Sequence, residues 1–358
     1  MSQGFSSKIT QKKHFAYLTE VRPDDFIDIA LATGGKPFHG KVLRKWFYRN
    51  RAKTFQEMTD ISLSMRKKLE ESYALFQLRE AALQKSEDGT VKFAFALIDG
   101  QIIETVIIPA RNRATLCLSS QVGCPLGCLF CASGLKGFVR NLTQGEMVEQ
   151  FLIASAHSSF PVSNVVFMGT GEPLLNLPNL RRTLEILIHR DCIDFGARRI
   201  TVSTIGLPEK IIELADFGLQ INLAISLHAA NDRTRREIVP AARQFKIADI
   251  LQAAQVYRQK TTRDVTFEYV LLGGVNDSHD DANELADLLE PFKCTVNLIA
   301  WNKVEGIGFD SPSRGSVPAF LKTLQNRNIS VTVRRSRGRD IDAACGQLYL
   351  QENRFSES

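Results

Sequence analysis

The regular alternation of strand-like and helical segments after residue 114 constrains the fold of this chain more than any other feature. The strand-like runs lie near 115–119, 164–168, 199–203, 221–227, 265–271, 295–300 and 330–334, and helical stretches fill the gaps near 144–157, 178–190, 208–217, 246–259, 280–290 and 316–327. Repeated βα units of this kind predict a parallel sheet covered by helices, either doubly wound or curled towards a barrel. In both folds the active site lies at the carboxyl ends of the strands.

A β-hairpin is expected before this region. Two apolar runs, VKFAFAL and QIIETVIIP, flank the residues around Asp99-Gly100, and an Asp-Gly loop between such runs is typical of a tight hairpin. The second strand carries Glu104. Strand alternation alone leaves open whether this carboxylate faces solvent or the interior.

The N-terminal part of the chain carries the whole net positive charge. Residues 1–75 hold 14 Lys and Arg against 8 Asp and Glu, a balance of +6, and the remaining 31 basic and 31 acidic residues cancel. Residues 37–74 have the spacing of short helices, in which Lys41, Lys45 and Arg49 share one face. This stripe is either an ordinary solvated face or a surface for RNA phosphates.

The cysteines predict metal chemistry. They number seven, and the first thirty residues lack the apolar segment of a secretory signal. We therefore expect a cytoplasmic protein without a disulfide scaffold. Cys124, Cys128 and Cys131 form a C-x3-C-x2-C motif, whose thiolates can ligate three irons of a [4Fe–4S] cluster and leave the fourth iron open. Structural zinc is the alternative, although no second cysteine pair has the spacing that it needs.

Polar residues follow the predicted strands at the edge where an active site belongs. Gly171-Glu172 follow the second strand, and Ser203 ends the third. Ser226 and His228 follow the fourth strand, and Asn302 follows the sixth. Each one alone is compatible with a plain turn or a satisfied strand end, but together they indicate one shared site.

The cysteine loop resembles that of the radical S-adenosylmethionine enzymes, and the likeness extends over residues 104–348. The strings SSQVGC, GFVRNLT, VVFMGTGEPLLN, VSTIG, LAISLHA, EYVLLGGVND, NLIAWN and RGRDIDAACGQL resemble the RlmN/Cfr group of RNA adenine methyltransferases. The resemblance implies an α/β fold, a partial (βα)6 TIM-like barrel of radical SAM type with a small N-terminal helical domain and a β-hairpin extension. We expect a basic helical domain over 1–75, the hairpin and linker over 76–113, the core barrel over 114–345 and a tail over 346–358.

By this resemblance the three motif cysteines hold one [4Fe–4S] cluster, and Glu172 pairs with the ammonium of S-adenosylmethionine. Gly171, Ser203, Ser226, His228 and Asn302 match further positions at this cofactor. Two molecules of S-adenosylmethionine are used per turnover: the first methylates Cys345, and the second supplies the radical that activates the S-methyl group.

The resemblance also implies how the methyl group leaves the protein. The activated carbon on Cys345 adds to the adenine ring, Glu104 accepts the ring proton, and Cys117 attacks Cys345 to form a transient disulfide. Without the resemblance, a packed terminal cysteine is the favoured interpretation of Cys345. Cys192 and Cys294 match no motif and are expected to be structural.

The implied substrate is carbon 2 of a specific adenosine in 23S ribosomal RNA, protein-poor or partly assembled, with transfer RNA as a further candidate. The alternatives are Cfr-like methylation of carbon 8 and a non-catalytic, metal-containing RNA-binding protein. We expect an electron donor such as flavodoxin, no membrane association and a monomer. Six positions depart from the usual pattern of the group and bear on substrate fit: Thr170, Ala230, Ala241, Ala242, Ala300 and Lys303.

Four arginines precede Cys345 within six residues: Arg334, Arg335, Arg337 and Arg339. A basic loop beside the methyl carrier suits RNA phosphates, and the target base would have to be unstacked to reach a buried radical. A surface cluster of salt bridges is the competing interpretation.

Overall fold

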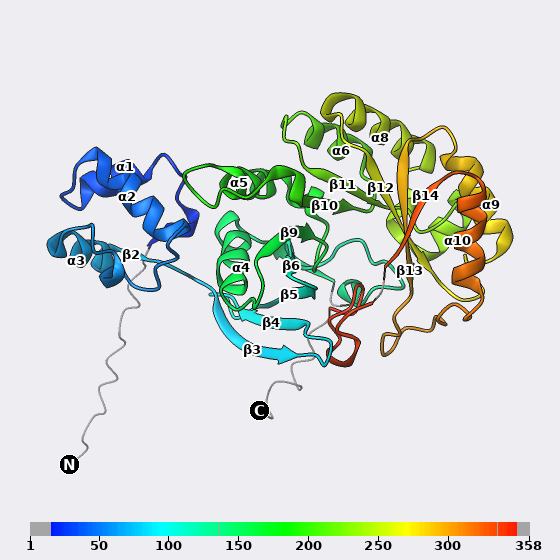
Figure 1. The fold of residues 1–358 in the computed structure, drawn as a ribbon, viewed down its shortest axis with the longest axis horizontal. Coiled ribbons are helices and arrows are strands. Elements are labelled where there is room, and N and C mark those ends of the chain that lie inside the picture. Colours follow the sequence, from blue (N-terminus) through cyan, green and yellow to red (C-terminus); the bar gives the residue numbers. More distant parts are fainter. Residues whose placement is uncertain (1–15, 136, 335, 349–358) are drawn as a thin grey trace, which may run out of the picture. The chain divides into compact units, whose positions relative to one another are not determined.

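The computed structural model describes residues 16–135, 137–334 and 336–348. The chain divides into two compact units, Met1–Gln77 and Leu78–Ser358 (Figure 1). Within the described ranges, no helix is long and apolar enough to cross a membrane.

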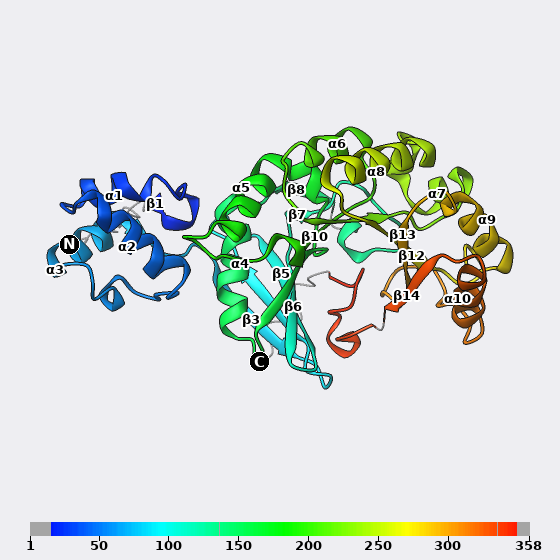
Figure 2. The same cartoon turned by 45° about the horizontal axis from the view of Figure 1, so that its top comes forward.

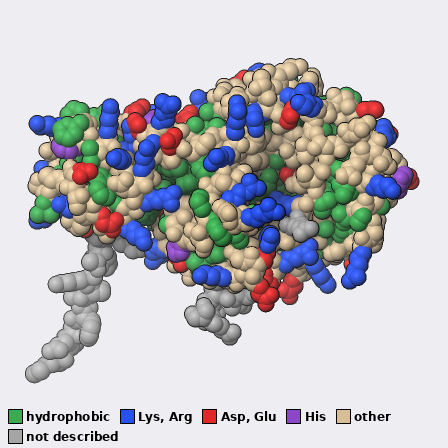
Figure 3. Space-filling model, viewed as in Figure 1, with side chains coloured by type: hydrophobic (Ala, Val, Ile, Leu, Met, Phe, Trp, Pro, Cys, Tyr) green, Lys and Arg blue, Asp and Glu red, His purple; other side chains and the backbone are tan. Residues whose placement is uncertain are grey.

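The N-terminal unit is built from α1 (Phe26–Ala32), α2 (Pro37–Tyr48) and α3 (Leu63–Ser72). Phe26 of α1 packs against Phe47 of α2 with ring centroids 6.3 Å apart. The two helices approach so closely that a Cβ on Gly40 would lie 2.6 Å from the Cα of Ile27, so only glycine fits there. The predicted basic face of α2 is exposed at Lys41, Lys45 and Arg49, and Figure 3 shows Lys and Arg side chains over the visible face of this unit.

The second unit is organised around one sheet in the order β14-β13-β12-β11-β10-β9-β6-β5-β4-β3. All pairs from β6 to β14 are parallel, and β3 to β6 pair antiparallel. The parallel strands are β6 (Arg113–Cys117), β9 (Val162–Phe167), β10 (Ile200–Thr204), β11 (Asn222–Ser226), β12 (Val265–Leu271), β13 (Cys294–Ala300) and β14 (Ser330–Arg334).

Helices follow the parallel strands and confirm the predicted partial barrel of βα units. They are α4 (Gln144–Ala156), α5 (Leu177–Ile188), α6 (Pro208–Ala215), α7 (Asp232–Ile238), α8 (Ile247–Thr261), α9 (His279–Leu289) and α10 (Ser316–Asn326). Figure 2 shows α5, α6, α8, α9 and α10 around the outside of the curved sheet. The strands are apolar on both faces, as in Leu223-Ala224-Ile225 of β11, because helices cover one face and the barrel interior the other.

The predicted hairpin is present as β4 (Val91–Ala96) and β5 (Ile102–Ala110), with Gly100 in the turn at φ +82°. A third antiparallel strand, β3 (Arg79–Lys85), pairs with β4 at the edge of the sheet. The pattern REAALQK gave no strand signal because an edge strand is largely exposed and is not required to be apolar.

The segment after β14 folds back over the antiparallel part of the sheet. Ala343 and Leu348 of this segment form a buried apolar cluster with Val106 of β5 and Cys117 of β6. Cys345 lies between the two anchoring residues, so this packing positions the segment that carries it.

Candidate active site

A cavity of about 1000 Å³, its open mouth included, lies at the carboxyl ends of the parallel strands. Residues of the β9, β10, β11, β12 and β13 ends line it together with the cysteine loop and the C-terminal segment. Its lining includes ten of the twelve site residues expected from the sequence: Cys124, Cys128, Cys131, Gly171, Glu172, Ser203, Ser226, His228, Asn302 and Cys345.

The cysteine loop begins directly after β7 (Gln121–Gly123), which pairs with β8 (Phe138–Asn141). A Cβ on Gly123, at φ +72°, would lie 1.8 Å from the carbonyl oxygen of Gly137, so the loop can start here only from glycine. The amide of Ala132, next to Cys131, donates to the carbonyl of Gly346 at 2.8 Å. This bond joins the cysteine loop to the segment that carries Cys345.

The three thiols of the loop fit an iron–sulfur cluster by their chemistry. Burial raises the pKa of Cys124 to about 12 and also raises the pKa of Cys128 and Cys131. Other thiols of the loop add to the shifts of Cys124 and Cys128, and Cys345 adds to that of Cys131. Clustered thiols of this kind become thiolates when a cationic metal group binds them. In the described part of the chain no group of three or more potential ligands converges on a single ion. A four-iron cube does not require this, because each thiolate binds a different iron.

Glu172 presents an oriented carboxylate to the cavity. Its Oε1 accepts from the amide of Leu174 at 3.0 Å and its Oε2 from the amide of Ile205 at 2.8 Å. Burial raises the pKa of Glu172 to about 7. A cationic ammonium beside it would favour the charged form, which is the chemistry that a bound methionine moiety supplies. Gly171 has φ +108°, and a Cβ there would lie 2.6 Å from Gln121.

The strand-end residues of β10 and β11 lie side by side. Ser203 and Ser226 have their hydroxyl oxygens 3.4 Å apart. His228 accepts from the amide of Val270 through Nδ1 at 3.1 Å. Burial lowers the pKa of His228 to about 3, and Arg235 adds to this effect, so the ring is neutral near pH 7. Arg235 is buried and was not expected from the sequence as a neighbour of this site.

Asn302 lines the cavity and also holds the C-terminal segment. Its Nδ2 donates to the carbonyl of Cys345 at 3.3 Å, and its Oδ1 accepts from Nε of Arg339 at 2.9 Å. Both polar atoms of the amide therefore have protein partners, which fixes the backbone at the exposed Cys345.

Glu104 and Cys117 lie outside the cavity lining, on the sheet face that the C-terminal segment covers. Val106 of β5 is the register partner of Cys117 of β6, and Glu104 lies two residues before Val106 and thus on the same face. Glu104 is only 2% exposed. The interpretation of Glu104 as a solvent-facing strand residue is therefore wrong, because the C-terminal segment buries this face.

Cys117 packs with Ala343 and Leu348, the residues on either side of Cys345 in the C-terminal segment, and the charges of Cys345 and Arg334 act on its thiol. Burial raises the pKa of the Cys117 thiol to about 12, and the guanidinium of Arg334 opposes this rise. A nucleophilic thiol reacts as the thiolate. Arg334 therefore supplies the positive charge that favours the reactive form of Cys117.

The structure corrects the expected basic loop. Arg334 is the last residue of β14 and lines the cavity, with Nη1 3.6 Å from Sδ of Met168. Strand alternation turns it inward, so its assignment to an RNA-facing surface loop is wrong. Arg337 lies 3.9 Å from Asp88, as the salt-bridge interpretation expects, and Arg339 bonds Asn302. Arg335 lies outside the described residues.

Glu268 of β12 is a buried cavity residue that the sequence analysis missed. Burial raises the pKa of its carboxyl group, and its Oε2 accepts from Nδ2 of Asn297 at 2.8 Å. The signal was present in the apolar run VTFEYVL, because a single carboxylate inside a strand buried on both faces points to a lined interior.

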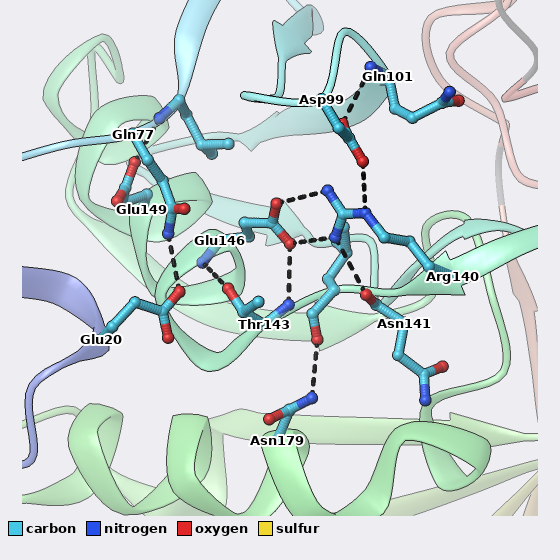
Figure 4. Close-up of polar contacts among 12 residues, drawn as sticks. Glu20, Gln77, Asp99, Gln101, Arg140, Asn141, Thr143, Glu146, Glu149 and Asn179 are labelled. Carbon is cyan, nitrogen blue, oxygen red and sulfur yellow. Dashed lines mark hydrogen bonds and ion pairs between the residues drawn. The ribbon is translucent and has the colours of Figure 1, made fainter. Parts of the chain in front are cut away.

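Arg140 connects the hairpin to the barrel (Figure 4). Its Nε donates to Asp99 in the β4–β5 turn at 2.6 Å, and its Nη atoms donate to both carboxylate oxygens of Glu146 at 2.8 Å. Glu146 also forms a capping box with Thr143 at the start of α4. The arginine in the string GFVRNLT therefore fixes the hairpin that carries Glu104.

Comparisons with known families agree with this geometry. The model of the radical SAM superfamily matches residues 118–289. A second model, described as the ribosomal RNA large subunit methyltransferase N-terminal domain, matches residues 18–75.

Close relatives cover nearly the whole chain. A Bacillus subtilis protein is 46% identical over 89% of each chain, and one from Rhodopirellula baltica is 43% identical over 91% of this chain and 88% of its own. Both are named "Probable dual-specificity RNA methyltransferase RlmN". The crystal structure of a radical SAM methyltransferase from Sphaerobacter thermophilus superimposes with a TM-score of 0.89 at 41% identity, covering 93% of this chain and 99% of that one. The chain therefore belongs to the RlmN family of radical S-adenosylmethionine methyltransferases.

Proposed function

We propose that this enzyme methylates carbon 2 of an adenosine in 23S ribosomal RNA, with transfer RNA as a second substrate, through an S-methyl group on Cys345. The observation that carries the proposal is the joining of two thiol sets in one site. The three-thiol loop and Cys345 line the same cavity, and the segment that carries Cys345 packs against Cys117 through Ala343 and Leu348. The relatives named as dual-specificity RNA methyltransferases support the choice of RNA.

The cofactor residues have distinct roles in this proposal. Cys124, Cys128 and Cys131 hold the [4Fe–4S] cluster, and Glu172 orients S-adenosylmethionine through its ammonium, with Ser203, Ser226, His228 and Asn302 around it. When bound, the cluster and S-adenosylmethionine supply the methyl group and the radical that activates it. A reduced donor of the flavodoxin type in the cytoplasm supplies the electron.

The remaining steps belong to residues of the chain. The activated carbon on Cys345 forms a bond to the adenine carbon, which leaves one unpaired electron on the ring. The ring gives up this electron, which the oxidised iron–sulfur cluster would accept, and the carboxylate of Glu104 accepts the proton that the adenine carbon loses. The thiolate of Cys117 then attacks the sulfur of Cys345. An S–S bond forms, the C–S bond breaks, and its electron pair passes to the departing carbon, which takes one proton from the surrounding water and becomes the new methyl group. The common sheet face of Glu104 and Cys117 supports these assignments.

Nucleoside analysis tests the proposal directly. The protein is expressed in a strain whose ribosomal RNA lacks 2-methyladenosine, and the digested RNA is analysed by mass spectrometry against both methyladenosine standards. We expect 2-methyladenosine with the natural protein and none with Cys345→Ala. Formation of 8-methyladenosine would favour the Cfr-like reaction, and RNA without either product despite an intact cluster would favour the non-catalytic alternative.

A further inference from the structure

A lysine lies buried beneath the C-terminal segment, beside the proton acceptor of the proposed reaction. Lys92 of β4 has a side chain only 6% exposed, and its Nζ lies 3.4 Å from Oε1 of Glu104, which is 3% exposed. In the register of β4 and β5, Ala94 opposes Glu104 and Lys92 opposes Val106. The two charged residues are therefore diagonal neighbours on one face of the sheet.

The same ammonium also touches the segment that carries Cys345. Nζ of Lys92 donates to the carbonyl oxygen of Asp342 at 3.4 Å, three residues before Cys345. Asp342 has a left-handed backbone, at φ +49°. This conformation is uncommon for a residue with a side chain and persists only where its surroundings hold it. Lys92 is one of the groups that hold it.

The neighbouring β3–β4 turn forms hydrogen bonds with the start of the same segment. Asp340 accepts from the hydroxyl of Ser86 at 2.6 Å and from the amide of Glu87 at 3.1 Å. The amide of Gly338 donates to Asp88 at 3.0 Å. A Cβ on Gly338 would lie 2.8 Å from the side chain of Thr90, so the segment and the turn touch directly. The antiparallel strands thus fix the approach to Cys345 at several points.

Stability alone is a poor reason for this buried pair. Moving a carboxylate and an ammonium out of water costs several kcal/mol for each ion, and their attraction often does no more than offset this cost. An apolar pair of the same size would hold the sheet at least as well. The charges are therefore better explained by what they do for the groups around them.

We propose that Lys92 is a positioning residue that keeps the carboxylate of Glu104 charged and aligned with the Cys345 segment, so that the proton acceptor and the methyl carrier meet at the same adenine carbon. This inference rests on the proposed function, because it gives Lys92 a part in that reaction. It assigns no contact between Lys92 and the RNA or the cofactors. Lys92 acts through Glu104 and through the backbone of Asp342.

The test compares Lys92→Met, which keeps the length but removes the charge, with Lys92→Arg, which keeps the charge. Lys85→Met is the matched control, since Lys85 is an exposed lysine of the adjoining strand β3. Each cluster-loaded protein reacts with S-adenosylmethionine, reductant and a 23S RNA fragment. Mass spectrometry measures methylation of Cys345 and 2-methyladenosine, and denaturing gels measure the covalent protein–RNA adduct.

We expect Lys92→Met to methylate Cys345 within about twofold of the natural protein but to form product at least about tenfold more slowly, because the proton acceptor is impaired. The protein–RNA adduct should accumulate. Lys92→Arg should recover most of the rate, and Lys85→Met should behave as the natural protein. A structural role would lower all readouts together and would not be relieved by arginine.

A double-mutant comparison tests whether Lys92 acts through Glu104. Glu104→Gln should itself accumulate the adduct. Adding Lys92→Met to Glu104→Gln should slow formation of 2-methyladenosine by no more than about twofold further, since the two residues act as a unit. If Lys92→Met slowed formation of 2-methyladenosine by the same factor in the Glu104→Gln protein as in the natural protein, the inference would be overturned. The double variant lacks both buried charges, so it remains testable if Lys92→Met alone does not fold.

The two proposals fail differently. A natural protein that transfers no methyl group to RNA would sink the proposed function. A natural protein that forms 2-methyladenosine, together with a Lys92→Met variant indistinguishable from Lys85→Met, would overturn the role of Lys92 alone.

Discussion

At the scale of single residues, the three cysteines of the motif lie on one loop and line one cavity. Replacing Cys124, Cys128 or Cys131 with Ala should abolish the iron and the iron–sulfur absorbance of anaerobically reconstituted protein, because a three-cysteine site has no spare ligand. Cys294→Ala, a half-buried cysteine on β13, is the control and should keep the full iron content. Stoichiometric zinc without iron in the natural protein would contradict this assignment.

His228 predicts a distinct pH dependence of stability. Burial lowers its pKa from 6.5 to about 3, so below pH 6.5 the unfolded chain binds a proton that the folded protein excludes. The stability that this ring contributes is complete above pH 6.5 and falls towards pH 3 by at most about 1.4 kcal/mol per pH unit. The opposite slope comes from Glu172, whose raised pKa of about 7 favours folding as the pH falls below 7.

A substitution of His228 separates its effect on the pH dependence of stability from that of Glu172. His228→Gln can still accept a hydrogen bond but does not titrate, and it leaves Glu172 in place. Denaturant titration gives the free energy of unfolding of each protein. The value for the natural protein minus that for His228→Gln should decrease as the pH is lowered from 6 to 4. A difference independent of pH would show that the buried ring does not exclude the proton.

The residues that line the cavity were predictable from the sequence, whereas the buried charges were not. Strand ends of a parallel sheet meet at one edge, so Glu172, Ser226 and His228 could be placed together from their positions alone. The burial of Glu104 depends on the segment after β14, more than 230 residues later in the chain, that folds over it. No local pattern carries that information, and the same applies to the Lys92–Glu104 pair.

At the scale of elements, apolar periodicity predicted the parallel strands closely. The run at 265–271 coincides with β12, and the run at 330–334 coincides with β14. The strands that apolar periodicity did not predict are short or exposed: β3 is a polar edge strand, and β7 has only three residues. In these elements neighbouring backbone, and not a buried apolar face, determines the structure.

The helix α2 carries an exposed basic face that we expect to contact RNA phosphates. The double variant Lys41→Glu/Lys45→Glu should weaken RNA binding without affecting reductive cleavage of S-adenosylmethionine. It should also reduce the slope of log binding constant against log salt by about 0.7 to 0.9 for each lost contact. Filter binding or fluorescence anisotropy at several salt concentrations measures this slope.

The matched control for α2 places the same charge change on the barrel unit. Lys293→Glu/Lys322→Glu alters two exposed lysines and the same net charge. If both double variants weaken RNA binding equally, the effect is one of net charge, and α2 has no specific role.

At the scale of the whole molecule, the fold unites residues that the sequence keeps far apart. Cys117 and Cys345 are 228 residues apart, yet the segment that carries Cys345 packs against Cys117 where it crosses the sheet. Hydrogen bonds from the turn after β3, the ammonium of Lys92, the side chain of Asn302 and the backbone amide of Ala132 hold the segment at that crossing. Only the family resemblance could pair these two cysteines from the sequence, because no periodicity links residues at this distance.

The strongest test of the proposed reaction is the fate of the S-methyl group on Cys345. Cys117→Ala should still methylate Cys345 and join it to RNA but cannot form the disulfide that releases the product, so a covalent protein–RNA adduct should persist through denaturation. The measurement is the amount of RNA that remains on purified, denatured Cys117→Ala protein, with the Cys117→Ala/Cys345→Ala double variant as reference. We expect a covalent adduct in the single variant and none in the double variant. Methylation of RNA by Cys117→Ala at the normal rate, without adduct, would contradict the proposed reaction.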